Sequence, residues 1–488
     1  MKGRRILRTL LFPAALVTLM LPARALAAQL KAADIVHGTY YIEVRLSFDK
    51  RPSYDESFRY DPDRYLLTLN ATKSALSARR LKELGTVGDN LLTRISVYKG
   101  GENLQLGFYL NQAVRPLISP AENTLSLRFY TALRAELLMQ LADGVSLTEK
   151  SSVYQGANVT LYIVRVDPQA AVALFSASAD RYDGKTRLRT PASFARREGA
   201  LAVINGGFFG KHGEHLTTLV EDGIMRASGV YPTRPMLVVT TAGQALIGRF
   251  GVVTALRFNG KSLPVNAKNY PFESGKVIVY DRAYPLESLP QQAMFYYLVR
   301  QGKLSYFSTN TKGLTLGAGE LLLATDIMPE VNPLKQVPDG AAVELETRIT
   351  DASGQTVQAA SAIGGAPMLV ENGAVEISVA EDKVRSDVAK SERSRTAVGV
   401  TPSGQLILAV VKEEEDAGFS GMTLKALANL LIAEGAVTAV NLDGGGSSAI
   451  VVAGQVLNTA EGAQRPVANV LVVKEKPRPK PAPQPATR

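Results

Sequence analysis

Val440–Ala449, with the sequence VNLDGGGSSA, is the stretch that says most about the fold of this chain. A predicted helix, which begins after Thr423 and ends at Gly435, and a predicted buried strand over residues 436–442 lead into it. The strand delivers Asp443 to three successive glycines, which bring no side chains to a packed core. Backbone N–H groups of such a run can approach a bound group closely, so the sequence predicts a loop that holds an anionic ligand. A hairpin turn with a solvated aspartate is the alternative.

Three further segments place glycine or polar residues at the ends of predicted strands. Residues 201–204 (LAVI) run into 205–210 (NGGFFG), residues 363–370 read IGGAPMLV, and residues 465–469 read RPVAN. Loops at strand ends are common places for binding and catalytic residues. We therefore expect these segments and the glycine loop to converge on one site.

The motifs occur in an order that resembles the phosphodiester glycosidase family, which includes the lysosomal uncovering enzyme that removes N-acetylglucosamine from a phosphodiester. The resemblance spans roughly residues 156–473, and an ordered set of motifs is far more specific than one glycine run. It implies a hydrolase of the glycosyl hydrolase type that cleaves sugar-1-phosphodiester bonds. The motifs are INGGFF at 204–209, RTAVGV at 395–400, GMTL at 421–424, NLDGGGSS at 441–448 and RPVAN at 465–469.

Two carboxylates are the predicted catalytic residues. Asp443 is the first, because a strand positions it beside the glycines, and Glu214 is the second, because it lies in a segment that resembles the family's Gly-Glu stretch. Turn capping by Asp443 and a solvated loop position for Glu214 are the alternatives. Asp222, beside Gly223, is a weaker third candidate and fits a turn residue better.

The remaining site residues are predicted to bind substrate. A sugar held through phosphate has a good leaving group, so the site mainly has to manage charge: carboxylates for the oxocarbenium-like sugar, and arginines and N–H groups for the phosphate. A surface ion pair for Arg395 and a turn-forming role for Asn205 are the alternatives. The predicted substrate-binding set is Asn205, Gly206, Gly207, Arg395, Thr396, Gly444, Gly445, Gly446, Ser447, Ser448, Arg465 and Asn469.

Metal dependence is left open by the sequence, which predicts no definite cofactor. His212 and His215 are three residues apart, but Gly210 and Gly213 disfavour the helix on which they would converge. An oxygen-only Ca²⁺ or Mg²⁺ site that includes Asp443 remains an option. The chain has no cysteine, which excludes disulfides, thiolate nucleophiles and cysteine metal ligands.

The N-terminus predicts export. Residues 1–28 combine basic residues, an apolar stretch over 10–21 and a small-residue cleavage pattern at 25–27, as in a cleaved signal peptide. No later segment approaches membrane length. Of the formal charge of +10, the first 28 residues and residues 474–488 carry nearly all, leaving about +1 for residues 29–473. We therefore expect a periplasmic or secreted protein that binds no nucleic acid.

Period-two alternation predicts a first domain of antiparallel strands. It appears over 40–48 and 104–110 and again over 125–129, with further strands at 64–69 and 92–98, and closes most simply as a β-sandwich over residues 29–130. Its strand order resembles AMIN domains, and this resemblance implies binding to peptidoglycan or another envelope polysaccharide. Residues 131–155 are predicted to be a connector with a short helical piece near 133–141.

The larger second domain, residues 156–473, is predicted to be mixed α+β with two pseudo-related halves. The halves are suggested by an echo: residues 234–240 with Gly243-Gln244, and residues 395–401 with Gly404-Gln405, share residues at equal offsets and each predict a strand, a turn and a return strand. Residues 474–488 form a basic, proline-rich tail that we expect to be disordered.

The leading hypothesis is a two-domain exported phosphodiester glycosidase that acts on envelope or extracellular glycans. A non-catalytic envelope glycan-binding or exopolysaccharide-assembly protein on the same fold is the alternative, because fold alone does not fix activity. A peptidoglycan amidase is a weaker competitor, since the sequence lacks the clustered His and Glu zinc ligands that it would need. The sequence does not identify the glycan.

Overall fold

A computed structural model describes most of the chain. It covers residues 27–37, 41–59, 62–89, 91–111, 116–130, 135–154, 157–179, 187–231, 233–290, 294–384, 386–412, 421–459 and 463–476. The predicted signal peptide, apart from its last two residues, and the tail beyond residue 476 lie outside these ranges. Among the described residues, no helix is long and apolar enough to span a membrane.

The chain is mostly β, so the predicted α+β class is wrong. Among the described residues, strands account for 51% and helices for 10%. Apolar runs such as 406–411 fit either a helix or a strand by pattern, but here they pair antiparallel with their neighbours and need no crossover helices. The described helices are α1 (Ala78–Leu84), α2 (Pro191–Glu198), α3 (Ser386–Lys390) and α4 (Leu424–Ala433).

The described part divides into two compact units, of which the first lies within residues 28–37, 42–111 and 118–128. The strands predicted there by alternation are all present, and their apolar sides are buried, as with Val44, Leu106 and Phe108. Sheet 1 runs β5 (Thr72–Ser74), β1 (Ala28–His37), β2 (Tyr41–Phe48), β9 (Thr124–Tyr130), β8 (Leu117–Ala121); sheet 2 runs β3 (Tyr54–Arg59), β4 (Arg64–Leu69), β7 (Asn103–Leu110), β6 (Leu92–Gly100).

The second unit contains four sheets, two of which carry most of the motifs. Sheet 3 runs β10 (Ala135–Ala142), β11 (Val145–Tyr154), β12 (Ala157–Val166), β31 (Leu406–Val411), β30 (Arg395–Val400), β32 (Thr438–Asn441), β28 (Met368–Glu371), β29 (Ala374–Val375). Sheet 4 runs β13 (Val172–Ser178), β35 (Asn469–Glu475), β14 (Ala202–Asn205), β33 (Ile450–Val452), β34 (Gln455–Val456). The helical piece expected near 133–141 is wrong, because residues 135–142 pair with β11 as an edge strand.

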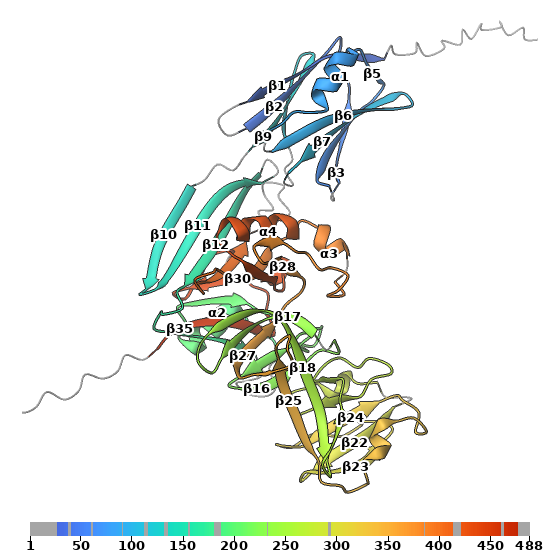
Figure 1. Cartoon of the computed structure of the whole chain (residues 1–488), viewed down its shortest axis with the longest axis vertical. Coiled ribbons are helices and arrows are strands. Elements are labelled where there is room, and N and C mark those ends of the chain that lie inside the picture. Colours follow the sequence, from blue (N-terminus) through green and yellow to red (C-terminus); the bar gives the residue numbers. More distant parts are fainter. Residues whose placement is uncertain are drawn as a thin grey trace, which may run out of the picture. The chain divides into compact units, whose positions relative to one another are not determined.

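Sheets 5 and 6 complete the second unit. Sheet 5 runs β16 (Ile224–Ala227), β15 (Leu219–Glu221), β27 (Ala359–Gly364), β17 (Thr233–Thr240), β18 (Ala245–Phe258), β25 (Glu344–Thr350), β26 (Thr356–Val357), with β19 (Lys261–Pro264) paired to β18. Sheet 6 runs β20 (Ala267–Lys268), β21 (Ile278–Tyr280), β24 (Leu321–Thr325), β22 (Phe295–Arg300), β23 (Lys303–Ser308). It belongs to residues 259–343, here called the insert, which β18 and β25 connect to the rest of the unit (Figure 1).

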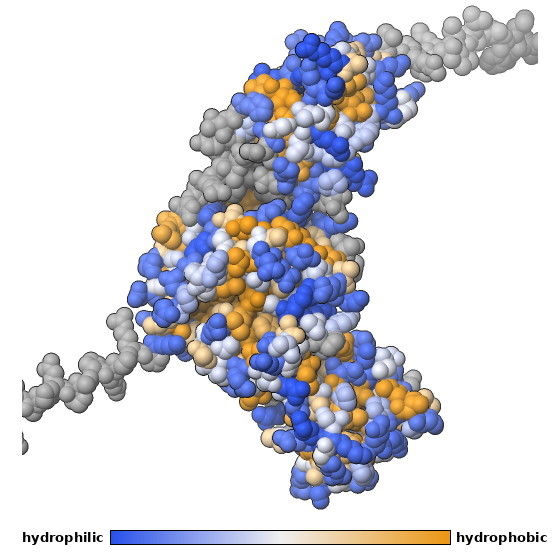
Figure 2. Space-filling model, in the orientation of Figure 1, coloured by the Kyte–Doolittle hydropathy of each residue, from blue (hydrophilic) through white to orange (hydrophobic). Residues whose placement is uncertain are grey.

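Sheets 3, 4 and 5 share one apolar core. Ile204 of β14, Leu237 of β17 and Val440 of β32 pack in the same buried cluster. The insert has separate clusters of its own, around Tyr280 and Leu323. Apolar side chains also reach the surface of the insert (Figure 2), where Tyr306, Phe307, Met328 and Val331 are exposed.

Local signals in the sequence are accurate. Helix α4 begins after Thr423, whose hydroxyl accepts the N–H of Ala426 at 3.2 Å, and the chain turns at Gly435 with φ of 94°. The echoed hairpins are also present and have matching turns. Gly243 and Gly404 have φ of 84° and 83°.

Candidate functional site

The predicted site segments meet where strands of sheets 3, 4 and 5 end. Asn205, the last residue of β14, is fully buried and ties three of these segments together. Its side-chain amide donates to the carbonyl of Asp443 at 2.7 Å, and its oxygen accepts from the hydroxyl of Thr396 at 2.7 Å and the N–H of Ala449 at 3.0 Å. Asn205 therefore holds both ends of the glycine loop and the adjacent strand β30, and Thr396 is part of the same support.

Asn469, at the start of β35, makes the second junction. Its side-chain oxygen accepts the N–H of Gly207 at 2.7 Å, and its amide nitrogen lies 3.1 Å from Nδ1 of His215. Gly206 allows this approach, because a Cβ at that position would lie 2.2 Å from the same Asn469 oxygen and 2.4 Å from Ile363. Four predicted site residues thus lie together, as the sequence predicts: Asn205, Gly206, Gly207 and Asn469. They form the packed layer beneath the loop.

The glycine loop extends from Asp443 to Ser447. Asp443 donates its N–H to the carbonyl of Gly206 at 3.0 Å, and Gly445, with φ of 58°, donates to the carbonyl of Ser394 at 2.7 Å. Glycine adopts that left-handed conformation more readily than residues with a side chain. The loop is thus fixed to β14 on one side and to the residue before β30 on the other.

The Asp443 carboxyl is half-buried on this loop. Burial raises its pKa above the ordinary value, and the Ser447 hydroxyl, the Gly444 N–H and the positive charge of Arg465 oppose the rise. The Gly444 N–H donates to its Oδ1 at 3.0 Å. A carboxyl with an upward-shifted pKa at an accessible loop is suited to proton transfer.

Two exposed arginines border the loop. A methyl group added at Gly445 would lie 3.9 Å from Cδ of Arg393, and one added at Gly446 would lie 3.9 Å from Cδ of Arg465. The Arg465 guanidinium also lies 5.5 Å from the centre of the Phe209 ring. Sequence reasoning missed Arg393, although its place two residues before the RTAVGV motif was a usable signal.

Arg395, predicted to bind phosphate, is occupied elsewhere. Its side chain is 1% exposed, and Nε donates to the carbonyl of Met422 at 2.8 Å. One terminal nitrogen donates to the carbonyls of Val388 and Ser391, at the end of α3. This arginine therefore organises the 388–395 segment beneath the loop. The hydroxyl-bearing residues Ser447 and Ser448 are also buried.

Glu214 lines a separate, water-sized hollow. The hollow, of about 10 Å³, lies between the 213–215 turn, Arg187 and Arg226, and residues 283–285 of the insert. One Glu214 oxygen accepts the N–H of His212 at 2.8 Å, and the negative charge of Glu214 contributes to raising the pKa of Tyr284 to about 12, which burial mainly causes. Asp443 is not among the lining residues. Glu214 precedes His215, which contacts Asn469, whereas the backbone of Asp443 bonds to Gly206 and Asn205.

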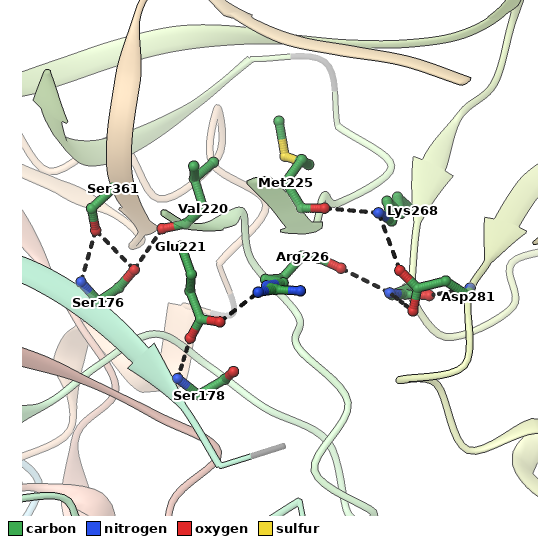
Figure 3. Close-up of polar contacts among 10 residues, drawn as sticks. Ser176, Ser178, Val220, Glu221, Met225, Arg226, Lys268, Asp281 and Ser361 are labelled. Carbon is green, nitrogen blue, oxygen red and sulfur yellow. Dashed lines mark hydrogen bonds and ion pairs between the residues drawn. The ribbon is translucent and has the colours of Figure 1, made fainter. Parts of the chain in front are cut away.

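A polar network shares Arg226 with this hollow (Figure 3). The fully buried Glu221 carboxylate accepts from Nε of Arg226 at 3.1 Å and from the N–H of Ser178. Next to it, Nζ of Lys268 lies 3.1 Å from the Asp281 carboxylate and donates to the carbonyl of Met225 at 2.8 Å. The pairs connect β13, β15 and β16 to the insert and fix Arg226 at the edge of the hollow.

Sequence comparison identifies the second half of this unit. Residues 296–474, which contain Arg395, Asp443, Arg465 and Asn469, match the sequence model of the phosphodiester glycosidase family. This region is therefore similar to phosphodiester glycosidase domains. Such domains act as hydrolases on phosphodiester-linked sugars. Asn205, Gly206, Gly207 and Glu214 precede the matched region, but the structure brings the first three against it.

Two solved structures with TM-scores above 0.5 share the fold of this chain. A hypothetical protein from Synechocystis has 18% identity and a TM-score of 0.61, covering 92% of this chain and 81% of its own. A protein of Burkholderia pseudomallei, named as a predicted exported protein, has 18% identity and a TM-score of 0.55, covering 94% and 98%. The catalytic domain of zebrafish N-acetylglucosamine-1-phosphodiester alpha-N-acetylglucosaminidase, auto-inhibited by its pro-peptide, has 17% identity and a TM-score of 0.39, covering 71% and 83%. No curated protein sequence is significantly similar to this chain.

Within the described residues, no group of three His, Asp or Glu residues is placed to hold a metal ion. The His215 ring contacts the Asn469 side chain, and residues 210–213 form a turn, so His212 and His215 do not lie on one face of a helix. Asp222 has φ of 51° in the turn that joins β15 to β16, as expected for a turn residue.

Proposed function

We propose that this protein is an exported hydrolase that cleaves sugar-1-phosphodiester bonds in envelope or extracellular glycans. The observation that carries the proposal is the half-buried Asp443 carboxyl on a glycine loop between Arg393 and Arg465. The family match of residues 296–474 supports hydrolysis of this bond class. The basic and apolar pattern of residues 1–28 supports export.

The chemistry follows from the charges around the loop. The two arginines bind the phosphodiester and take up the charge that grows on the leaving phosphate as the bond to the anomeric carbon breaks. Asp443 accepts the proton of the attacking water, and its raised pKa makes it a better base near neutral pH than an ordinary aspartate. Because phosphate leaves readily, a second carboxyl acting as an acid is not required at this loop, which is consistent with the separate position of Glu214.

Asp443→Asn tests the assignment. The amide keeps the size and can still accept the Gly444 N–H, so the fold should persist while turnover of sugar-1-phosphodiesters falls about 10²–10⁴-fold. Asp222→Asn is the matched control, because Asn tolerates the left-handed turn conformation and the residue is exposed. Wild-type kcat in folded Asp443→Asn would overturn the role. If the wild-type protein binds such glycans without turning any over, the non-catalytic alternative replaces the enzyme.

We also propose that the first unit binds the envelope glycan through the outer face of sheet 2. There the Arg94 guanidinium lies 3.7 Å from the centre of the Tyr109 ring, Arg64 lies 5.6 Å from it, and the Tyr98 and Tyr109 hydroxyls are 2.6 Å apart. Gly107 leaves room for the Tyr98 ring, because a Cβ added at position 107 would lie 3.2 Å from the nearest atom of that ring. The Tyr109 ring itself is buried, so the exposed Tyr98 ring and the Arg94 guanidinium form the surface, which suits a glycan that carries carboxylates or phosphates.

The docking proposal has a direct assay. Arg94→Ala with Tyr98→Ala should reduce co-sedimentation of the protein with cell-wall sacculi, and added salt should weaken wild-type binding. Arg79→Ala on α1 is the control, because its side chain is 90% exposed and forms an ion pair with the neighbouring Glu83 at 3.0 Å. Equal retention of both variants would reject this face as the docking surface.

A further inference from the structure

We propose that a hollow in the insert is a distal subsite for further units of a phosphodiester-linked glycan, so that the enzyme prefers oligomeric or polymeric substrates. The proposal rests on the proposed function and names the substrate class. The hollow measures about 580 Å³ and lies between residues 286–287 and 310–314. This volume falls within the roughly 300–1,000 Å³ of typical ligand pockets.

The lining of this hollow has the chemistry of a sugar site. Leu286 and Leu314 pack against the buried cluster of the insert around Tyr280, and so form an apolar floor. Glu287, Asn310 and Lys312 are exposed at the rim. The apolar floor suits the C–H face of a sugar ring, while the carboxylate and the amide can pair with hydroxyls. The lysine ammonium adds a partner for a phosphodiester in the same polymer.

The position of the hollow relates it to the rest of the unit. Residues 283–285 line the Glu214 hollow, and the next two residues, Leu286 and Glu287, line the larger one. One short segment of the insert is therefore a wall of both. Glu214 is followed by His215, which contacts Asn469 beneath the glycine loop. A glycan bound at the loop would extend past the segment 283–287 to reach the insert.

The insert offers a matched comparison. A second hollow, of about 310 Å³, lies where β18 and β25 enter the insert, and its polar lining is similar: Arg257 of β18, Glu344 of β25, and Asn259 and Lys261 of the insert. It is built at the β18–β19 turn, and Arg257 is already paired with Glu346 at 2.6 Å. Its residues do not belong to the 283–287 wall. Lys261→Ala therefore removes the same charge from the same insert without touching the proposed subsite.

The experiment compares substrate length. The full protein is assayed on a hexose 1-phosphate monomethyl diester and on an oligomer of about four hexose units joined through 1-phosphodiesters. Lys312→Ala and Glu287→Gln should each lower kcat/KM for the oligomer about fivefold to twentyfold and leave kcat/KM for the short diester within twofold. Lys261→Ala should change neither. Equal effects on the two substrates, or no effect on the oligomer, would overturn the subsite.

Equilibrium binding separates failure of the subsite from failure of the proposed function. The oligomer is titrated into Asp443→Asn, with and without Lys312→Ala, by calorimetry. If the wild-type protein hydrolyses neither substrate but Lys312→Ala weakens oligomer binding fivefold or more, the proposed enzyme activity is wrong and the subsite stands. If hydrolysis is observed while Lys312→Ala leaves oligomer binding unchanged, the subsite is wrong and the enzyme stands.

Discussion

Replacement of Arg395 by lysine should destabilise the fold while leaving the chemistry of each folded molecule nearly intact. The Arg395 guanidinium is buried and donates to three carbonyls, those of Val388, Ser391 and Met422. A lysine ammonium is a compact charge on a flexible stem. It cannot reproduce the planar guanidinium fork that reaches these three carbonyls. The Met422 carbonyl also accepts the N–H of Arg393 at 3.4 Å, and the Val388 carbonyl also accepts the Ser391 hydroxyl at 3.2 Å, so the Ser391 carbonyl is the acceptor that depends most on Arg395.

The size of the loss can be worked from these contacts. A hydrogen bond to a charged group contributes about 1.5–3 kcal/mol, and an unsatisfied buried acceptor costs about 1–3 kcal/mol. Loss of one or two of the three bonds therefore predicts a decrease of about 2–4 kcal/mol in the free energy of unfolding. At about 2 °C per kcal/mol for a large domain, Tm should fall by about 4–8 °C.

The assay pairs thermal unfolding with specific activity, and exposed arginines provide the contrast. Arg393→Ala and Arg465→Ala should shift Tm by less than about 1 °C, because exposed substitutions rarely cost more than about 0.5 kcal/mol, yet each should lower kcat/KM about tenfold or more. The reasoning is refuted if Arg395→Lys keeps the wild-type Tm and loses activity. That result would mean that Arg395 binds the substrate phosphate.

Three further predictions follow from the geometry. Burial raises the pKa of Asp443 in the folded protein above its unfolded value near 3.8, so ionisation of this carboxyl lowers the free energy of unfolding as pH rises from the unfolded to the folded pKa. Asp443→Asn should therefore have a higher Tm than wild type above that pH window and the same Tm below it. A Tm difference that does not depend on pH contradicts this. The Tyr98 hydroxyl bond lowers the pKa of Tyr109 to about 8, so absorbance at 295 nm should show one tyrosine ionising there, and Tyr98→Phe should move it upward. Gly206→Ala should prevent stable folding by contact with Asn469, whereas Gly446→Ala should fold normally and lose turnover, as soluble yield and activity will show.

The parts of the fold that the sequence predicts well depend on local backbone chemistry. Thr423 caps α4 in any environment, and a glycine at the turn of each echoed hairpin is required by its positive φ. The fold class depends instead on what the apolar runs pair with. Residues 135–142 show the difficulty, because an edge strand with exposed Leu137 and Leu138 has no alternating pattern and resembles a short helix.

Side-chain roles at the site are harder to predict, because the same sequence pattern is compatible with a side chain that faces the ligand and with one that faces the interior. An arginine before a buried strand could face a ligand or the interior, and the deciding feature for Arg395 is the end of α3, whose carbonyls lie within its reach. Asn205 is similar, since an asparagine after a strand could face a sugar or tie a loop. The RPVAN motif points to Arg465, whereas the position of Arg393 beside Gly445 is found only in the structure.

The glycine clusters themselves divide into two kinds, and this division explains why several of them occur in one unit. At Gly206, Gly207 and Gly365 a Cβ would lie within 2.2–2.4 Å of another segment, so these glycines let strand ends from sheets 3, 4 and 5 approach each other. At Gly445 and Gly446 the nearest atoms are 3.9 Å away and belong to arginine side chains, so these glycines leave accessible backbone between two cations. The close-packed glycines bring Asn205 and Asn469 to these strand ends, Asn205 fixes the loop through Asp443 and Ala449, and the loop presents the Asp443 carboxyl. The geometry of the proposed catalytic group is therefore set by residues that need not touch the substrate.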